Sequence, residues 1–165
     1  MHKLFITLLV FFVAVSCKET QKEEVDQDAS GYVISTEKWP KKRSLDSKAS
    51  AILQEWPEFM AMDVSFDALY NAGNREDLSL TIDNIIEEQK LLEKSTYPEQ
   101  FNTPQIKSRQ KVFKTYLLKV KGDLYYYLDP EASVNEMIDS YNIMRQQFNA
   151  VVNHTFDAQL ILDDE

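Results

Sequence analysis

Cysteine and histidine, the side chains that most often ligate metals or act as nucleophile and base, are almost absent from this chain. Cys17 is the only cysteine, which excludes an intrachain disulfide and any zinc site built on several thiolates. The histidines are His2 and His154, and neither stands in a Cys-x-x-Cys-His haem motif or in the Glu-x-x-His pair of a di-iron bundle. We therefore predict that the folded part holds no metal and no cofactor.

Glycine is also scarce, and this limits the enzymes that the chain can be. Gly31, Gly73 and Gly122 stand far apart, so no glycine-rich loop can cradle a phosphate group. A Ser-His-Asp triad would have to be built around His154 alone. A pair of carboxylates acting as acid and base on a sugar stays open, although a helical bundle offers few deep clefts. We predict that the protein is not an enzyme.

Positive charge is in the minority, with a formal net charge of −9 at pH 7. Binding to phosphate backbones needs a concentrated positive face, so nucleic acid is not expected as a partner. The chain is rich in Leu, Ile, Glu, Lys and Gln and poor in turn residues, a composition that favours helices over sandwiches and barrels.

The first residues combine a charged start with one apolar run. Lys3 precedes residues 4–15, which number about 12 and are too few for a helix that needs roughly 20 residues to cross a bilayer. A basic start, a short apolar segment and a small residue before the cut are typical of a secretory signal. The run ends at Ser16 and Cys17, and the segment Ala14-Val15-Ser16-Cys17 resembles the lipobox of bacterial lipoproteins.

This resemblance to bacterial lipoproteins implies that residues 1–16 form a signal peptide and that Cys17 becomes the lipid-bearing N-terminus. In that family the cysteine carries a diacylglyceryl group and usually an N-acyl chain such as palmitate, and several chains give stable anchoring. Lys18 replaces the aspartate that retains many lipoproteins in the inner membrane, and the charged residues 18–24 resemble a tract used for export to the cell surface. The resemblance implies lipid anchoring in the outer membrane, on its periplasmic face or at the cell surface.

Residues 17–43 are predicted to form the lipidated cysteine and a disordered tether. The stretch 18–43 carries six basic and six acidic side chains and no sustained apolar period. A flexible chain of this length has an end-to-end distance of roughly 28 Å. A few apolar residues interrupt the tether, and they either pack on the folded part or form a short segment that binds a partner. These residues are Tyr32, Val33, Ile34 and Trp39.

Four segments of residues 44–165 place apolar residues at the three- and four-residue spacings of a helix. The first covers about residues 44–72 and contains Pro57, which lacks a backbone donor and therefore kinks or splits the helix, the kinked form being preferred. The other boundaries are set by capping residues and first-turn prolines. These boundary signals are Gly73-Asn74, Thr103-Pro104 and Asp129-Pro130.

We predict an all-α protein, with residues 44–165 folded as an antiparallel up-and-down four-helix bundle whose first helix is kinked or split at the proline. In overall look this domain is similar to small uncharacterised helical lipoproteins. That likeness brings no functional motif with it.

The third predicted helix is the basic element of an acidic domain. Residues 104–128 carry six basic side chains and one acidic one, whereas residues 130–165 carry one and seven. Four lysines recur on one face of this helix: Lys107, Lys111, Lys114 and Lys121. Two interpretations stay open, because the lysines either balance acidic helices across the bundle or bind an anion or a protein partner.

Tyr125, Tyr126 and Tyr127 follow one another, and consecutive residues of a helix point about 100° apart. At least one of the three rings should therefore be exposed, where tyrosine is a common interface anchor. The chain as a whole predicts a non-enzymatic interaction or adaptor module, anchored in the outer membrane by its lipid and open to a protein partner. The alternative is a helical bundle that binds a small apolar or anionic ligand.

Overall fold

The computed structural model describes the backbone of residues 33–162 and the side chains of residues 33–153. In this part of the chain every regular element is helical, apart from an isolated bridge between Val33 and Asn74. The elements are α2 (Ser47–Gln54), α3 (Pro57–Asp67), η1 (Ala68–Asn71), α4 (Arg75–Lys94), η2 (Glu99–Phe101), α5 (Pro104–Tyr125) and α6 (Glu131–Leu162). The all-α prediction is confirmed, but the described residues form five α-helices instead of four.

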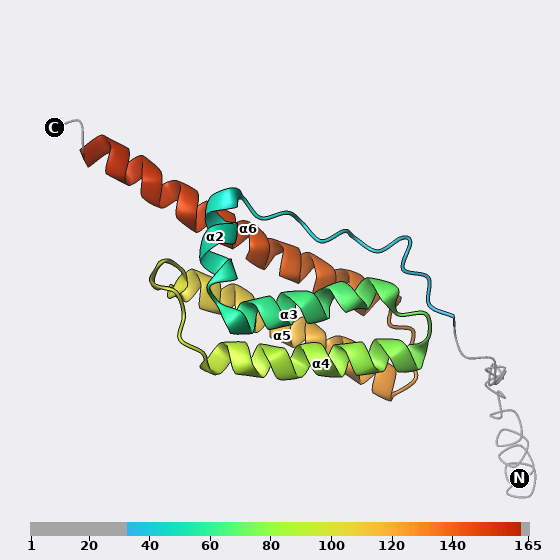
Figure 1. The fold of residues 1–165 in the computed structure, drawn as a ribbon. Coiled ribbons are helices and arrows are strands. Elements are labelled where there is room, and N and C mark those ends of the chain that lie inside the picture. The colour runs from blue at the N-terminus through green and yellow to red at the C-terminus, as the bar shows by residue number, and fades with distance from the viewer. Residues whose placement is uncertain (1–32, 163–165) are drawn as a thin grey trace, which may run out of the picture. The chain divides into compact units, whose positions relative to one another are not determined.

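The additional helix arises at Pro57. The C-cap of α2 is Glu55, Trp56 is non-helical with φ −113° and ψ 89°, and α3 begins at Pro57 itself. Proline suits the first position of a helix, because the N–H that it lacks would have no partner there. The kinked continuous helix preferred from the sequence is therefore wrong, and α2 stands across the end of α3 instead of extending it (Figure 1).

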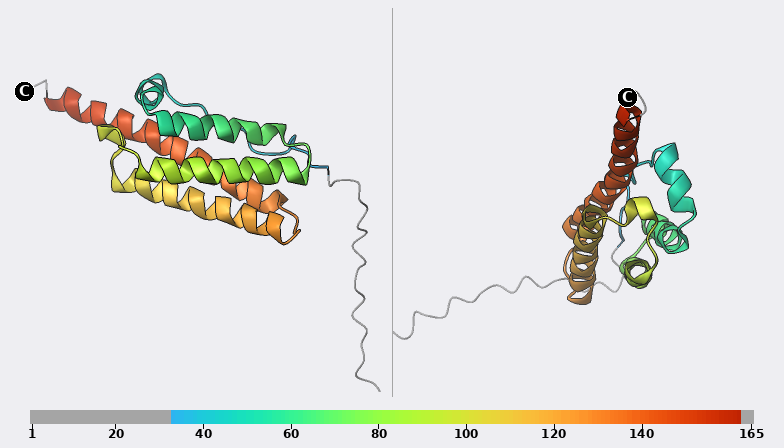
Figure 2. Two further views of the ribbon diagram at one scale, coloured as in Figure 1. Left: turned by 60° about the horizontal axis from the view of Figure 1, so that its bottom comes forward. Right: turned by 90° about the vertical axis from the view of Figure 1, so that its left-hand side faces the viewer.

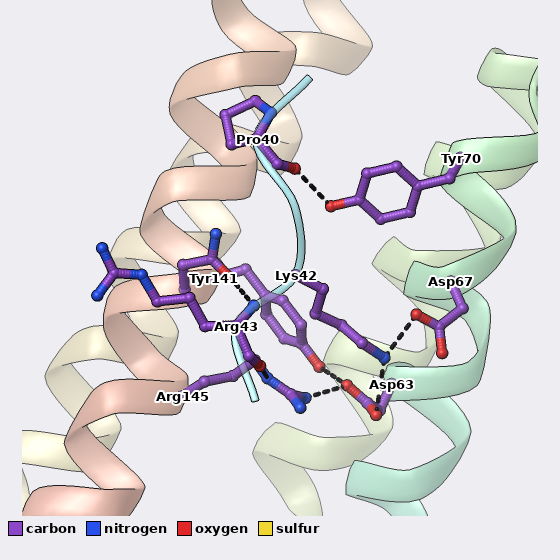
Figure 3. A network of polar contacts seen from close by, with 9 residues as sticks. Pro40, Lys42, Arg43, Asp63, Asp67, Tyr70, Tyr141 and Arg145 are labelled. Atoms are coloured by element: carbon purple, nitrogen blue, oxygen red, sulfur yellow. Dashed lines mark hydrogen bonds and ion pairs between the residues drawn. The ribbon is translucent and has the colours of Figure 1, made fainter. Parts of the chain in front are cut away.

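The other four helices lie side by side (Figures 1 and 2). Each packs on the next along the chain, α3 on α4, α4 on α5 and α5 on α6. Residues 33–46, which we call the strap, run from the η1–α4 turn to the start of α2. Figure 3 shows part of the strap between α3 and α6, the first and last of the four helices.

The strap corrects the predicted tether. Residues 33–43, predicted to be disordered, lie against α3, η1 and α6, so the folded part begins before residue 44. Trp39 is 6% exposed, and Ile34 N donates a hydrogen bond to Gly73 O at 3.1 Å. The remainder of the predicted tether lies outside the described residues.

Polar side chains of α6 hold the strap by its backbone. Asn142 accepts from Arg43 N at 2.8 Å and donates to Lys41 O at 3.0 Å. Arg145 Nε donates to Arg43 O at 2.6 Å. Backbone groups that leave water need hydrogen-bond partners, and the strap has no helix or sheet of its own to supply them. The side chains of α6 therefore allow an extended segment to pack between two helices.

Two of the predicted helix starts are confirmed by their caps. Asn74 Oδ1 accepts from Asp77 N at 2.8 Å, and Thr103 Oγ1 accepts from Ile106 N at 3.3 Å. Each cap satisfies one of the backbone N–H groups that the first turn of a helix leaves without an intrahelical partner.

Aromatic rings from three helices fill the core. Phe66 of α3 stacks on Tyr141 of α6 with ring centroids 4.0 Å apart, and Phe113 of α5 lies 4.9 Å from the same tyrosine. Nearer the α2 end of the core, Phe59 meets Phe148 edge to face at 5.3 Å. Such contacts join helices that are distant in sequence and determine how α3, α5 and α6 pack.

Crossing a bilayer takes a helix of about 20 mostly apolar residues. No helix within residues 33–162 combines that length with that apolar character.

Candidate functional site

Asp63 lies at the centre of a polar cluster between the strap, α3 and α6 (Figure 3). Its carboxylate accepts hydrogen bonds from the Tyr141 hydroxyl at 2.5 Å and from the Lys42 ammonium at 3.0 Å, and it forms an ion pair with Arg145. Lys42 also pairs with Asp67 at 2.5 Å. We call these residues the Asp63 cluster. The centre of the cluster is shielded from water, since the Asp63 and Arg145 side chains are only 16% and 6% exposed.

The Asp63 cluster fastens the strap to the helices. Burial, and then the neighbouring Asp63 carboxylate, raise the pKa of Tyr141 well above its usual value, so the hydroxyl stays protonated and donates to Asp63. Three donors from the protein itself thus surround this carboxylate. An acid or base in catalysis needs access to a substrate. The Asp63 carboxylate is instead bonded to donors of the protein itself.

Two open hollows adjoin at the turn between α4 and α5. The first, of about 700 Å³, lies between the α2–α3 junction and the turn. The second, of about 600 Å³, lies between the turn and the first part of α5. Both are lined by Thr96 and Tyr97, so the hollows meet at these two residues.

Tyr97 is held in place by its ring and by its hydroxyl. The ring lies 4.8 Å from that of Trp56, and Lys107 Nζ lies 5.1 Å from its centroid. The hydroxyl donates to Gln110 Oε1. Burial raises the pKa of Tyr97, which keeps this donor protonated. The contacts of Tyr97 therefore hold the turn in position.

The second hollow is rich in hydrogen-bond donors. Lys107 and Lys111 line it, and Lys111 forms no ion pair with the side chains of residues 33–153. Gln110 is 2% exposed, and its Nε2 has no hydrogen-bond partner in that part of the chain. Leaving a buried amide donor unpaired is unfavourable, but this Nε2 is not accessible to solvent, so the donors that an outside group can reach are those on the surface of the hollow. Lys107 and Lys111 bring two positive charges to a hollow that Glu93, itself paired with Lys114, also lines, and this excess of positive charge suits a carboxylate or another anion.

The structure divides the four predicted lysines into two pairs with different surroundings. Lys114 and Lys121 each form an ion pair with an acidic residue of α4 at 2.6 Å, in agreement with the charge-balancing interpretation. Lys107 and Lys111 stand nearer the start of α5 and line the second hollow, where the anion- or partner-binding interpretation stays open.

The sequence patterns did not single out Gln110 or Asp63. A signal for Gln110 was present, because it occupies a buried position between Ile106 and Phe113 where helical spacing calls for an apolar residue. Asp63 had no comparable signal, since its partners on α6 are 78 and 82 positions away along the chain.

All three consecutive tyrosines are exposed, where at least one was predicted to be. The structure describes neither Cys17 nor the side chain of His154. The lipid at Cys17 and the absence of a cofactor therefore stay predictions. Among the side chains that are described, no three His, Cys, Asp or Glu residues gather as a metal site would require.

No protein-family model, curated protein or solved structure matches this chain.

Proposed function

We propose that this protein is a non-enzymatic binding module, held at the outer membrane by a lipid on Cys17, whose protein partner docks an acidic segment at the α4–α5 turn. In this proposal α3 to α6 act as an antiparallel up-and-down four-helix bundle that carries the binding surface. The strap connects the bundle to its anchor.

The donor-rich hollow beside Tyr97 is the main support for this function. Lys107 and Lys111 bring positive charge to one place on an acidic protein, and Lys111 forms no ion pair with the other described side chains. The unpaired Nε2 of Gln110 offers a buried donor at the same position. An acidic side chain of a partner would meet both lysines, and it would reach this buried donor only if the Gln110 side chain moved.

A small anionic ligand is the second candidate, since the same donors would bind a free carboxylate. A protein segment fits the surface better, because the two hollows lie next to each other and share Thr96 and Tyr97 in their walls. Ile52, Trp56 and Pro98 contribute apolar surface to the first hollow. A segment with an acidic residue next to an apolar one would therefore contact both.

Photo-crosslinking in the protein's own cells tests this function. With a crosslinking amino acid at Thr96 of the full chain, we expect one crosslinked protein of defined mass. Lys111→Glu should lower its yield roughly ten-fold, equivalent to about 1.4 kcal/mol of binding free energy, because the new charge repels an acidic segment.

Arg109→Glu is the matched control for this experiment. It makes the same charge change on an exposed residue of the same helix that does not line either hollow, and the yield should stay unchanged. An equal loss in both variants would contradict the proposed site, since it would reflect net charge alone. A Gln110 side-chain amide resonance that shifts on addition of succinate, without any crosslinked protein, would favour the small ligand.

The anchor is tested separately from the binding surface. Cys17→Ser should move the protein from the membrane fraction to the soluble fraction, because the lipid would have no site of attachment. A variant that stays fully membrane-bound would show that the anchor is wrong, whatever the crosslinking result.

A further inference from the structure

The turn between α5 and α6 presents four large side chains to solvent. Tyr125, Tyr126 and Tyr127 are 74%, 71% and 81% exposed, and Leu128 is 54% exposed. We call residues 125–128 the tyrosine turn. The other exposed large apolar residues of the described part are single side chains spread over the strap and the helices. Contiguous exposed apolar groups of this kind mark contact surfaces more often than isolated ones do.

Hydrogen bonds order the backbone of the tyrosine turn. Tyr127 N donates to Leu124 O at 3.3 Å, and Leu128 N donates to Asp123 O at 2.8 Å, a pattern that commonly ends a helix with a left-handed glycine. Tyr127 occupies the left-handed position here, with φ 57°. A β-carbon makes that conformation unfavourable, and glycine would avoid the strain. Neither burial nor backbone preference accounts for a tyrosine at this position, and apart from a contact with Arg75 its ring is open to solvent.

Arg75 braces the turn from the start of α4. Its guanidinium donates to Leu124 O at 3.3 Å and to Leu128 O at 2.9 Å. Its Cζ also lies 5.5 Å from the centroid of the Tyr127 ring. These bonds hold the turn in one conformation before any contact forms. Less conformational entropy is therefore lost when the turn binds a surface.

The strap begins at the same end of the helices as the tyrosine turn. Val33 bridges Asn74, and it shares a small hollow with Pro130, just beyond the turn. Residues 18–32 separate Val33 from Cys17, and even a fully extended chain of that length spans at most about 55 Å. The lipid-bearing segment thus joins the domain at this end of the helices, and a lipid on Cys17 would hold this end within that distance of the bilayer.

We propose that the tyrosine turn contacts the headgroup region of the membrane and sets the orientation of the domain on it. The contact rests on the proposed function, because the lipid on Cys17 is what brings the turn to the surface. Tyrosine suits this region, since its ring is apolar and its hydroxyl can stay in contact with water and headgroups. Asp123 and Asp129 stand beside the turn, so the contact does not rely on attraction to anionic lipid.

This orientation has a consequence for the binding surface. Arg75, at the start of α4, meets the tyrosine turn, whereas Tyr97 follows the end of the same helix. A helix of the length of α4 spans about 30 Å. The hollows beside Tyr97 would therefore face away from the membrane, toward a partner.

Tryptophan placed in the full lipidated chain reports directly on contact with lipid. The protein is reconstituted in phosphatidylcholine vesicles whose acyl chains carry bromine, which quenches tryptophan emission on contact, or do not. The natural Trp39 and Trp56 are 6% and 2% exposed, so the unsubstituted chain supplies the baseline. We expect bromine to quench Tyr126→Trp at least about two-fold more than this baseline, because the ring sits among the lipids.

Leu91→Trp is the matched control, since Leu91 is 54% exposed and lies near the far end of α4. It should be quenched no more than the unsubstituted chain. Equal quenching of the two variants, or quenching of neither, would overturn the proposed contact. A change in Tyr126→Trp emission that follows protein density instead of bromine would also overturn it, because the turn would then join two copies of the chain.

Vesicle flotation is measured first and separates the two proposals. A chain that does not float with the vesicles lacks the anchor, and both the anchor and the membrane contact are then wrong. A chain that floats but shows no bromine quenching at Tyr126→Trp retains its anchor and loses only the membrane contact.

Discussion

The Asp63 cluster and the ion pairs between α4 and α5 use the same side-chain chemistry in different surroundings. Asp63 and Arg145 are 16% and 6% exposed, whereas Lys121 and Asp83 are 51% and 49% exposed. An ion pair in water gains little, because solvent screens it and two long side chains lose freedom. A buried charge that loses its partner cannot recover its hydration, so the Asp63 cluster depends on its buried members, Asp63, Tyr141 and Arg145.

This difference separates a structural role from a role in binding. The Asp63 cluster joins the strap, α3 and α6, and it thereby determines the path of the chain into the domain. The α5 lysines keep much of their contact with water, so Lys111 can exchange solvent for a partner at little cost.

The largest effect is expected for Asp63→Ala. We expect a loss of about 3–5 kcal/mol in the free energy of unfolding, because the buried Arg145 would keep its charge without a partner. Urea unfolding measures this loss, and hydrogen exchange should show faster opening of the strap. Asp67→Ala is the control, since Asp67 is 58% exposed and binds the same Lys42, and it should cost at most about 1 kcal/mol. Similar losses in the two variants would contradict the importance of burial.

Gln89→Met should stabilise the protein. Gln89 is fully buried in α4, and neither its Nε2 nor its Oε1 has a hydrogen-bond partner in the described residues. Replacing the amide by an apolar chain of similar shape should raise the free energy of unfolding by about 1–2 kcal/mol. The control is Gln110→Met, which loses the bond from Tyr97 and should gain less or lose stability. A lower melting temperature for Gln89→Met would be the opposite of this expectation.

Tyr141→Phe should change how stability depends on pH. The raised pKa of Tyr141 means that above pH about 10 the unfolded chain releases this proton while the folded chain retains it. The contribution of Tyr141 to the free energy of unfolding is therefore fully present below pH about 10, and it is lost as the pH rises through the folded-state pKa. We therefore expect a shallower alkaline decline in Tyr141→Phe, and a loss of about 1–2 kcal/mol at pH 7 because Asp63 loses a donor.

The matched control for this pH dependence is Tyr125→Phe, at a tyrosine that is 74% exposed. Chemical unfolding between pH 7 and pH 11 should give the same slope for this variant as for the unsubstituted chain. If Tyr125→Phe and Tyr141→Phe flattened the alkaline decline equally, burial of Tyr141 would not be its cause.

The smallest effect is expected for the pair of Lys121 and Asp83. A double-mutant cycle with alanine at both positions should give a coupling energy of about 0.2–1 kcal/mol, because both side chains are half exposed. The coupling should shrink further at high salt. A coupling as large as that within the Asp63 cluster would remove the distinction between the two sets of ion pairs.

Most helix boundaries could be predicted because their signals are local. Asn74 and Thr103 cap helices with side chains that reach only three residues along the chain. Pro57 by itself does not decide between one kinked helix and two separate helices, because a proline interrupts the helical hydrogen bonds in both cases. Contacts of Trp56 with Tyr97 and Ser95 favour the break, and they involve residues from the α4–α5 turn.

The strap and the second hollow could not be predicted for a related reason. The strap is held by hydrogen bonds from Asn142 and Arg145 and has no apolar period that would reveal its order. These partners lie about 100 residues away along the chain, so no local sequence pattern indicates the pairing. The unpaired Gln110 amide appears only when α5 is packed against the turn. Composition and spacing contain neither kind of information.

The sequence by itself determined that the chain is helical, where most helices begin, and which face of each is apolar, since propensity, capping and periodicity act within a few residues. Only the tertiary structure decided that the strap is ordered, that Asp63 is surrounded by donors, and that two of the four lysines line a hollow. Those features depend on which distant segments come together and on how much water they exclude. Exclusion of water decides whether a charge acts as a structural contact or stays available for a partner.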